Sequence, residues 1–151
     1  PYRRLKDLLG SRWTVGELVR FHTAEKLLVL AHDPAAYRAL GRLVAAARGR
    51  PRAEVSGGYG QAFMSGLAKL ATPGKHVNVL QHLAGFFKRQ LTADERAEIG
   101  EVIEEYRQAV VSLVVPITLL RHHVRRLGIS YLADQVYLNP HPRELMLRNA
   151  V

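Results

Sequence analysis

The residues best suited to contact a ligand form a stripe without acids in the segment 73–91. Its residues at helical spacing are Lys75, Asn78, His82 and Arg89, which supply cations, an amide and an imidazole, and Lys88 flanks the stripe. Such groups on one helix face suit contacts to phosphates and base edges. The alternative is an ordinary solvated face, but such a face usually mixes acids with bases. The stripe therefore favours binding of an anion or a nucleic acid.

A second cationic cluster lies in the segment 116–127, where four residues are candidates for binding: Arg121, His122, Arg125 and Arg126. The pairs 121/125 and 122/126 stand four residues apart, so on a helix their members are neighbours and repel one another. A polyanion would relieve that repulsion. The alternative is that these cations pair with the acidic segment that precedes them, residues 92–105.

Two further sets of candidates leave their alternatives open. His22 and Lys26 stand four residues apart on a mostly apolar helix that also carries Glu25. They are expected either to line a pocket for an anion or to form a buried Lys–Glu pair beside a hydrogen-bonded histidine. In the tail, Arg143 and Arg148 follow several tyrosines, which either stack on bases or belong to the core.

Catalytic motifs are absent from the sequence. The glycine-rich stretch 56–61 lacks the Gly-Lys-Ser/Thr ending of a P-loop, so we expect a tight entrance to a helix there. The seven histidines form no zinc-binding helix motif. The chain has no cysteine, which excludes disulfides, zinc thiolate sites and iron–sulfur clusters held by this chain alone. We therefore predict no catalytic residue, metal site or cofactor in this domain.

The charge balance points to a polyanionic partner. The 151 residues are 48% hydrophobic, enough for one domain with a real core, and their net charge is +9. Segment 92–105 holds six acids and one base, so the remainder carries +14. Such a cationic body attracts tRNA or other RNA. An arginine-rich composition inherited from a GC-rich or heat-adapted source is the alternative. No apolar run approaches the roughly 20 residues that cross a bilayer, and the lack of cysteine fits a cytoplasmic protein.

Hydrophobic spacing predicts an all-α fold, a single compact bundle of about seven to nine helices. The expected helices cover residues 2–9, 15–32, 34–48, 58–71, 73–91, 93–113, 116–127, 130–138 and 142–149. Capping residues begin four of them: Thr14, Asp33, Thr72 and Thr92. Pro116 is expected to break or kink the chain. The helix 15–32 is expected to be central, because four consecutive apolar residues, 27–30, leave it no continuous polar face.

Five segments carry a resemblance to a known bacterial family. They are residues 12–28 (RWTVGELVRFHTAEKLL), 59–64 (YGQAFM), 72–82 (TPGKHVNVLQH), 116–122 (PITLLRH) and 135–149 (QVYLNPHPRELMLRN). Together they resemble the YbgA-like family, a domain catalogued as of unknown function. The likeness extends over residues 12–151, and several motifs in the same order make it specific.

The resemblance implies a function. In that family the domain occurs alone or fused behind a desulfidase domain, whose cysteines and iron–sulfur cluster remove sulfur from thiolated uracil, as in 4-thiouridine of tRNA. It implies that residues 12–151 are a tRNA-binding accessory domain and that residues 1–11 are a linker or helix from an upstream desulfidase domain that holds the cluster. It makes seven residues candidates for a shared site: His22, Lys26, Lys75, Asn78, His82, Arg121 and Arg143.

Two other functions stay open at this point. An enzyme in its own right would bring His22, Lys26 and His82 around a pocket for an anionic ligand. A protein-interaction module would dock its partner through an exposed apolar patch around residues 2–9.

Overall fold

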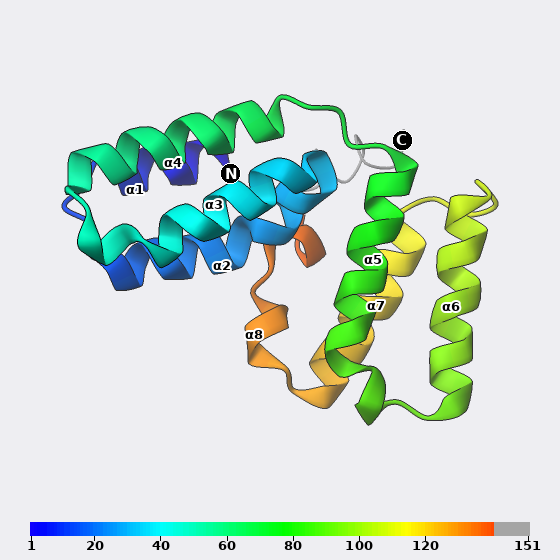
Figure 1. The fold of residues 1–151 in the computed structure, drawn as a ribbon. Coiled ribbons are helices and arrows are strands. Elements are labelled where there is room, and N and C mark those ends of the chain that lie inside the picture. The colour runs from blue at the N-terminus through cyan, green and yellow to red at the C-terminus, as the bar shows by residue number, and fades with distance from the viewer. Residues whose placement is uncertain (141–151) are drawn as a thin grey trace. The chain divides into compact units, whose positions relative to one another are not determined.

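The structure, a computed structural model, describes residues 1–140 and confirms the all-α class (Figure 1). Within that range there are eight α-helices, three short 3₁₀ helices and no strand. The helices group into two compact units, residues 1–70 and residues 71–151, called here the first and the second unit. Within the described range, no helix is both long enough and apolar enough to cross a membrane.

The first unit is built from four helices. They are α1 (Tyr2–Leu9), α2 (Val15–His32), α3 (Pro34–Ala45) and α4 (Arg52–Leu67), with a 3₁₀ turn, η1 (Ala47–Gly49), before α4. Helix α3 packs against both α2 and α4, and α1 packs against α4. Three rings at the centre of the unit contact one another, those of Phe21, Tyr59 and Phe63. Residues 27–31 of α2 are all buried, as expected for a helix without a continuous polar face.

Helices α3 and α4 approach closely at one glycine. A Cβ atom added to Gly66 would lie 2.6 Å from the Cβ atom of Ala36, a distance that real Cβ atoms essentially never show. No side chain therefore fits at position 66 without a shift of one helix. Burying Ala36 and Gly66 against each other brings the larger core residues on both helices into contact.

Up to residue 140, the second unit contains three longer α-helices and one short one. They are α5 (Pro73–Phe87), α6 (Ala93–Arg107), α7 (Val114–Leu127) and α8 (Ser130–Ala133), with 3₁₀ turns η2 (Lys88–Gln90) and η3 (Val136–Leu138). Helices α5, α6 and α7 all contact one another, while α8 and η3 pack on α7. A buried hydrogen bond of 2.7 Å joins the His76 imidazole on α5 to the Tyr137 hydroxyl in η3.

Side-chain caps fix the predicted starts of four helices. Thr14, Thr72 and Thr92 each accept a hydrogen bond from the backbone N–H three residues ahead, and Asp33 accepts one from Ala35. These caps begin α2, α5, α6 and α3 at the residues predicted for them. At Thr92 the carboxylate of Glu95 also accepts a bond from the backbone N–H of Thr92, which completes a capping box.

Other expectations were wrong. Helix α4 begins at Arg52 rather than near residue 58, so the glycine-rich stretch 56–61 lies inside the helix instead of forming its entrance. Pro116 does not break the chain, because it occupies the first turn of α7, where a missing N–H costs nothing. Helix α6 ends at Arg107 rather than near residue 113, so Val110 lies beyond the helix, where it is 65% exposed.

Candidate functional site

Helix α7 divides its cations between an acid-paired side and an open side. The Arg126 guanidinium donates a 2.8 Å hydrogen bond to a carboxylate oxygen of Glu95 on α6. His123 is buried, and its Nδ1 lies 3.7 Å from the same oxygen. Burial holds the pKa of His123 below its ordinary value. Pairing with the acidic helix, the alternative raised by the sequence, therefore holds for Arg126.

The other cations of α7 have different surroundings. Arg125 is exposed, and within residues 1–140 its guanidinium contacts no carboxylate. Arg121 is half-buried, and its guanidinium lies 3.4 Å from the carbonyl oxygen of Leu138. The exposed His122 ring contacts the ring of His123 at 5.3 Å. The open side of α7 thus presents Arg125 and His122, with Arg121 at its edge.

The six acids of α6 differ in their partners and in their exposure. Glu95 contacts α7, and Glu104 accepts hydrogen bonds from Arg107 and Gln108 of its own helix and C-cap. The remaining four acids, Asp94, Glu98, Glu101 and Glu105, are exposed, and their spacing puts them on one face of the helix. Of the six acids, only Glu95 forms an ion pair with the cations of α7 within the described residues.

The stripe predicted in residues 73–91 lies at the surface on α5 and, for Lys88 and Arg89, on η2. Asn78, His82, Lys88 and Arg89 are exposed, and Lys75 is half-buried. The ring of His82 meets the ring of Phe86 at 5.2 Å. No acid occurs in residues 71–91. The stripe is therefore a largely exposed face that carries cations and no acid, as the sequence predicts.

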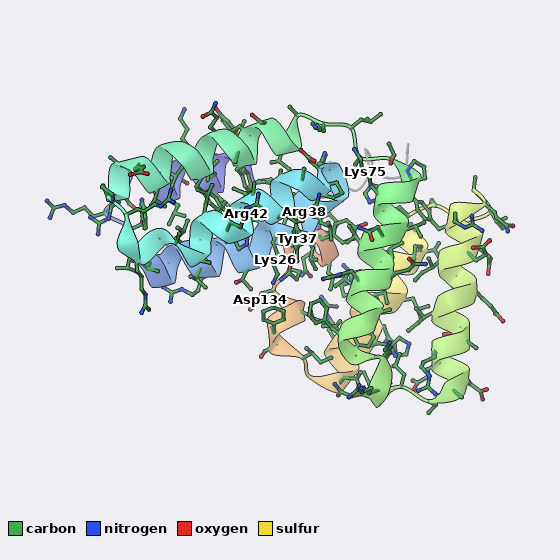
Figure 2. The ribbon with its side chains drawn as sticks, viewed as in Figure 1. Lys26, Tyr37, Arg38, Arg42, Lys75 and Asp134 are labelled. Carbon is green, nitrogen blue, oxygen red and sulfur yellow. The ribbon has the colours of Figure 1, made fainter. Side chains whose placement is uncertain are left out.

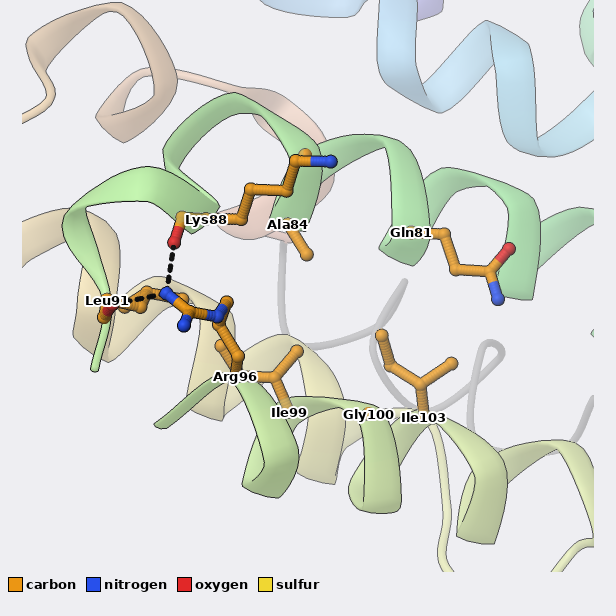
Figure 3. A pocket seen from close by; sticks show the side chains of 9 residues that line it. Gln81, Ala84, Lys88, Leu91, Arg96, Ile99, Gly100 and Ile103 are labelled. Atoms are coloured by element: carbon orange, nitrogen blue, oxygen red, sulfur yellow. Dashed lines mark hydrogen bonds between the residues drawn. The ribbon is translucent and has the colours of Figure 1, made fainter. Parts of the chain in front are cut away.

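A groove between α5 and α6 is a feature that the sequence did not indicate. It holds about 270 Å³ and is lined mainly by apolar side chains, among them Ala84, Ile99 and Ile103, which Figure 3 shows directed into the space between the helices. Lys88 and Arg96 lie at its edge. The Arg96 guanidinium donates to the carbonyl oxygens of Leu91 at 2.6 Å and Lys88 at 3.3 Å. No carboxylate or imidazole lines this groove, so it holds no acid–base pair for catalysis.

In the first unit, His22 is a neutral hydrogen-bonding group. Its Nδ1 lies 3.1 Å from the hydroxyl of Tyr59, a residue with no exposed surface. Burial, with a further contribution from the charge of Lys26, lowers the pKa of His22 to about 4. Burial and the nearby Glu25 charge raise the pKa of the Tyr59 hydroxyl. At neutral pH this histidine therefore brings no positive charge to an anion.

The buried carboxylate beside it is paired with a residue that the sequence did not single out. Glu25 has no exposed surface, and its Oε1 lies 3.1 Å from a guanidinium nitrogen of Arg4 on α1. The sequence alternative paired Glu25 with Lys26, its neighbour on α2; Lys26 is half-buried (Figure 2). Arg4 is 21 residues away from Glu25, so no local pattern predicts the contact.

Two arginines on α3 also escaped the sequence interpretation. Arg38 and Arg42 stand four residues apart on the exposed face of a helix that contains no acid (Figure 2). Neither side chain has an ion pair within the described residues. Their spacing is that of Arg121 and Arg125, so the rule that singled out residues 116–127 would also have found them. The remaining candidates, Arg143 and Arg148, lie outside the described residues.

The first unit is the more basic of the two. Residues 1–70 contain twelve Lys and Arg against five Asp and Glu, a net charge of +7. Three of those acids form ion pairs: Glu25 with Arg4, Glu54 with Arg50, and Asp33 with Lys69. Apart from Lys26, the other eight cations form no ion pair within the part of the chain that the structure describes. The candidates are separate cationic faces: one on α3 in the first unit, and two in the second unit, on α5 with η2 and on α7.

Comparison with known proteins assigns the family. The family model described as "Protein of unknown function (DUF1722)" matches residues 26–142. The chain is also 30% identical over 138 residues to "Uncharacterized protein YbgA" of Escherichia coli (strain K12), covering 91% of this chain and 82% of that protein. No solved structure matches. The chain is an all-helical basic protein of the YbgA-like, DUF1722 family.

Proposed function

We propose that this chain is an RNA-binding domain that holds tRNA by its phosphates, as the accessory domain of a tRNA thiouridine desulfidase. One observation carries the proposal: three parts of the chain, α3, α5 with η2, and α7, present arginines and lysines on faces without acids. Residues 34–45, 71–91 and 114–133 hold eight Lys and Arg and no Asp or Glu. The exposed acids of α6 occupy a face of their own, so they leave most of these cations unneutralised.

The side-chain types suit phosphate better than a generic anion. Six of the eight cations on these segments are arginines. Arginine forms planar, bidentate contacts to phosphate and also stacks on bases. Contacts of this kind release the counterions condensed on the RNA, so the affinity falls steeply as salt rises. The desulfidase part of the proposal rests on the family resemblance. Because the chain has no cysteine, the sulfur chemistry is assigned to another domain.

Titration of bulk tRNA across a salt series tests the proposal. The native chain is expected to bind tRNA, with log Kd rising linearly with log salt concentration. Arg125→Gln should weaken binding and lower the slope by about 0.7–0.9, the value for one lost phosphate contact. Arg107→Gln is the matched control, because Arg107 is also an exposed arginine but is already paired with Glu104. Absence of tRNA binding by the native chain at low salt would overturn the proposal.

A converse variant removes an acid instead of a cation. Glu95→Gln frees the guanidinium of Arg126, while glutamine at this position still completes the capping box of α6. We expect tighter tRNA binding and a steeper salt slope. Glu101→Gln removes the same charge from the exposed face of α6 without freeing an arginine, so its effect is expected to be smaller. Equal effects of the two variants would remove Arg126 from the interface.

A further inference from the structure

Three aromatic rings form a continuous set on the surface of the second unit. The ring of His82 meets that of Phe86 edge to face, with centroids 5.2 Å apart and planes at 83°. The ring of Phe86 in turn meets that of Tyr131, on α8, at 5.9 Å and 58°. Phe86 is 45% exposed and Tyr131 is 44% exposed. The set therefore spans two helices and keeps nearly half of its two larger rings in contact with solvent.

Packing does not account for the exposure of Phe86. The neighbouring residue Phe87 is 1% exposed and supplies the ring that anchors the end of α5 in the core. Phe86 lies instead on the polar side of the helix, four residues after His82 and eight after Asn78. A large ring held at the surface among polar groups is typical of a recognition surface.

The charges near these rings are suited to a polyanion. Lys88 and Arg89 follow Phe86 by two and three residues, and both are exposed. Within residues 1–140, neither side chain forms an ion pair. Across residues 71–91 and 114–140 the one acid is Asp134, which follows Tyr131 by three residues, against six Lys and Arg. An apolar protein partner would need no such excess of cations.

We propose that His82, Phe86 and Tyr131 are a stacking platform for unpaired RNA bases, with Lys88 and Arg89 on the adjoining phosphates. This inference rests on the proposed RNA binding and names the part of the RNA that is recognised. Bases in a duplex are stacked on one another and hide their faces, whereas bases in loops and single-stranded ends offer theirs to aromatic side chains. Alternating aromatic and cationic groups are the usual elements of single-strand recognition.

The test compares the affinities of the full chain for two RNA probes. One is a labelled single-stranded oligouridine, and the other is a blunt RNA duplex of the same length, each measured by fluorescence anisotropy across a salt series. Phe86→Ala is expected to weaken oligouridine binding about tenfold, the effect of losing one stacked base, and to leave the salt slope unchanged. Duplex affinity should change little. Val110→Ala is the matched control, because it removes another exposed apolar side chain of the second unit, 65% exposed, away from the rings.

A second variant gives a readout other than affinity. Phe86→Trp keeps a stacking ring, so affinity should be retained, and its fluorescence should be quenched when oligouridine binds. The chain's own tryptophan, Trp13, is 2% exposed in the first unit and serves as the background to subtract. Unchanged fluorescence of the Phe86→Trp variant in the bound complex would show that no base reaches this ring.

The outcomes separate the platform from the RNA binding on which it rests. If the native chain binds RNA but Phe86→Ala binds oligouridine as tightly as the native chain, the platform is wrong and the phosphate-binding proposal stands. If Phe86→Ala weakens duplex and single strand equally, the ring supports the surface without stacking on bases, and the platform is also wrong. If the native chain binds neither probe nor tRNA, both proposals fail.

Discussion

Burial makes His22 a group whose protonation opposes folding. Its pKa in the folded chain is about 4, against an ordinary value of 6.5. Between these two pH values the unfolded chain binds a proton that the folded chain does not. Stability therefore falls as the pH falls through this range, and above pH 6.5 the effect is absent. The hydroxyl of Tyr59 and the positive charge of Lys26 both lie close to the imidazole. Protonation of His22 would therefore place a second positive charge beside that of Lys26.

The resulting prediction concerns acid sensitivity. Lowering the pH from 7.5 to 5 should cost the native chain about 2 kcal/mol of unfolding free energy through His22 alone, from 1.36 kcal/mol per pKa unit. His22→Gln keeps a hydrogen-bonding group beside Tyr59 but cannot take up the proton, so it should lose less stability over the same range. Urea denaturation at both pH values measures the difference. Burial also lowers the pKa of His123, so the comparison between native and variant chains is what isolates His22. Identical losses in the two proteins would contradict the assignment.

At the scale of single residues, the sequence identified the polar side chains of α5 and α7 but not their partners. The exposure of Asn78, His82 and Arg125 follows from helical spacing. The hydrogen-bond partner of His22 is Tyr59, 37 residues later, and the ion-pair partner of Glu25 is Arg4, 21 residues earlier. Contacts between helices distant in the sequence leave no periodic signal. They could be described only once the packing of α1, α2 and α4 was known.

At the scale of elements, a side-chain cap made the start of a helix predictable, although α1 and α8 also begin where the sequence placed them without one. The four helices that begin at a side-chain cap start where the sequence placed them. Helices α4 and α7 have no side-chain cap, and their starts were misplaced by about six and two residues. The glycines of α4 added to the error, because glycine is normally unfavourable inside a helix. Packing explains why two of these positions hold glycine. A Cβ atom on Gly60 would lie 3.1 Å from a methyl group of Leu9, and Gly66 contacts Ala36.

That explanation predicts opposite effects for two glycines of the same helix. Gly66→Ala forces its new methyl group against Ala36, so it should destabilise the chain by about 1–3 kcal/mol. Gly57→Ala is the matched control, because its Cβ atom would meet nothing within 4 Å. It should stabilise the chain by up to about 1 kcal/mol through helix propensity alone. Urea denaturation of the two variants measures both effects.

A double-mutant cycle checks the cause. Adding Ala36→Gly to the Gly66→Ala variant removes the methyl group on the other side of the contact, and should recover part of the lost stability despite the helical cost of a new glycine. If Gly66→Ala is as harmless as Gly57→Ala, the close approach of α3 and α4 is not what requires glycine at position 66.

At the scale of the whole molecule, the net charge of +9 conceals an uneven distribution. The first unit carries +7, so the second, residues 71–151, carries +2. The sequence drew attention to the second unit, because its acids gather in one segment and make the cations of α5 and α7 conspicuous. The larger excess lies in the first unit, where Arg38 and Arg42 are spread through a helix rich in alanine and leucine. Composition alone could not show this, because the division of the chain into units becomes visible only in the fold.

If the cations of both units contact tRNA, their contributions to the salt dependence should add. Arg38→Gln with Arg42→Gln removes two cations from α3, and Lys88→Gln with Arg125→Gln removes two from α5–η2 and α7. Each pair should lower the slope of log Kd against log salt by about 1.4–1.8, and the fourfold variant by about twice that, because each lost phosphate contact contributes about 0.7–0.9. Arg50→Gln and Arg107→Gln serve as controls, because each of these arginines is already paired with a glutamate. The four test positions and the two control positions are all exposed arginines or lysines. A pair that leaves the slope unchanged would place its unit outside the tRNA-binding surface, and a fourfold effect equal to one pair alone would show that a single unit carries the binding.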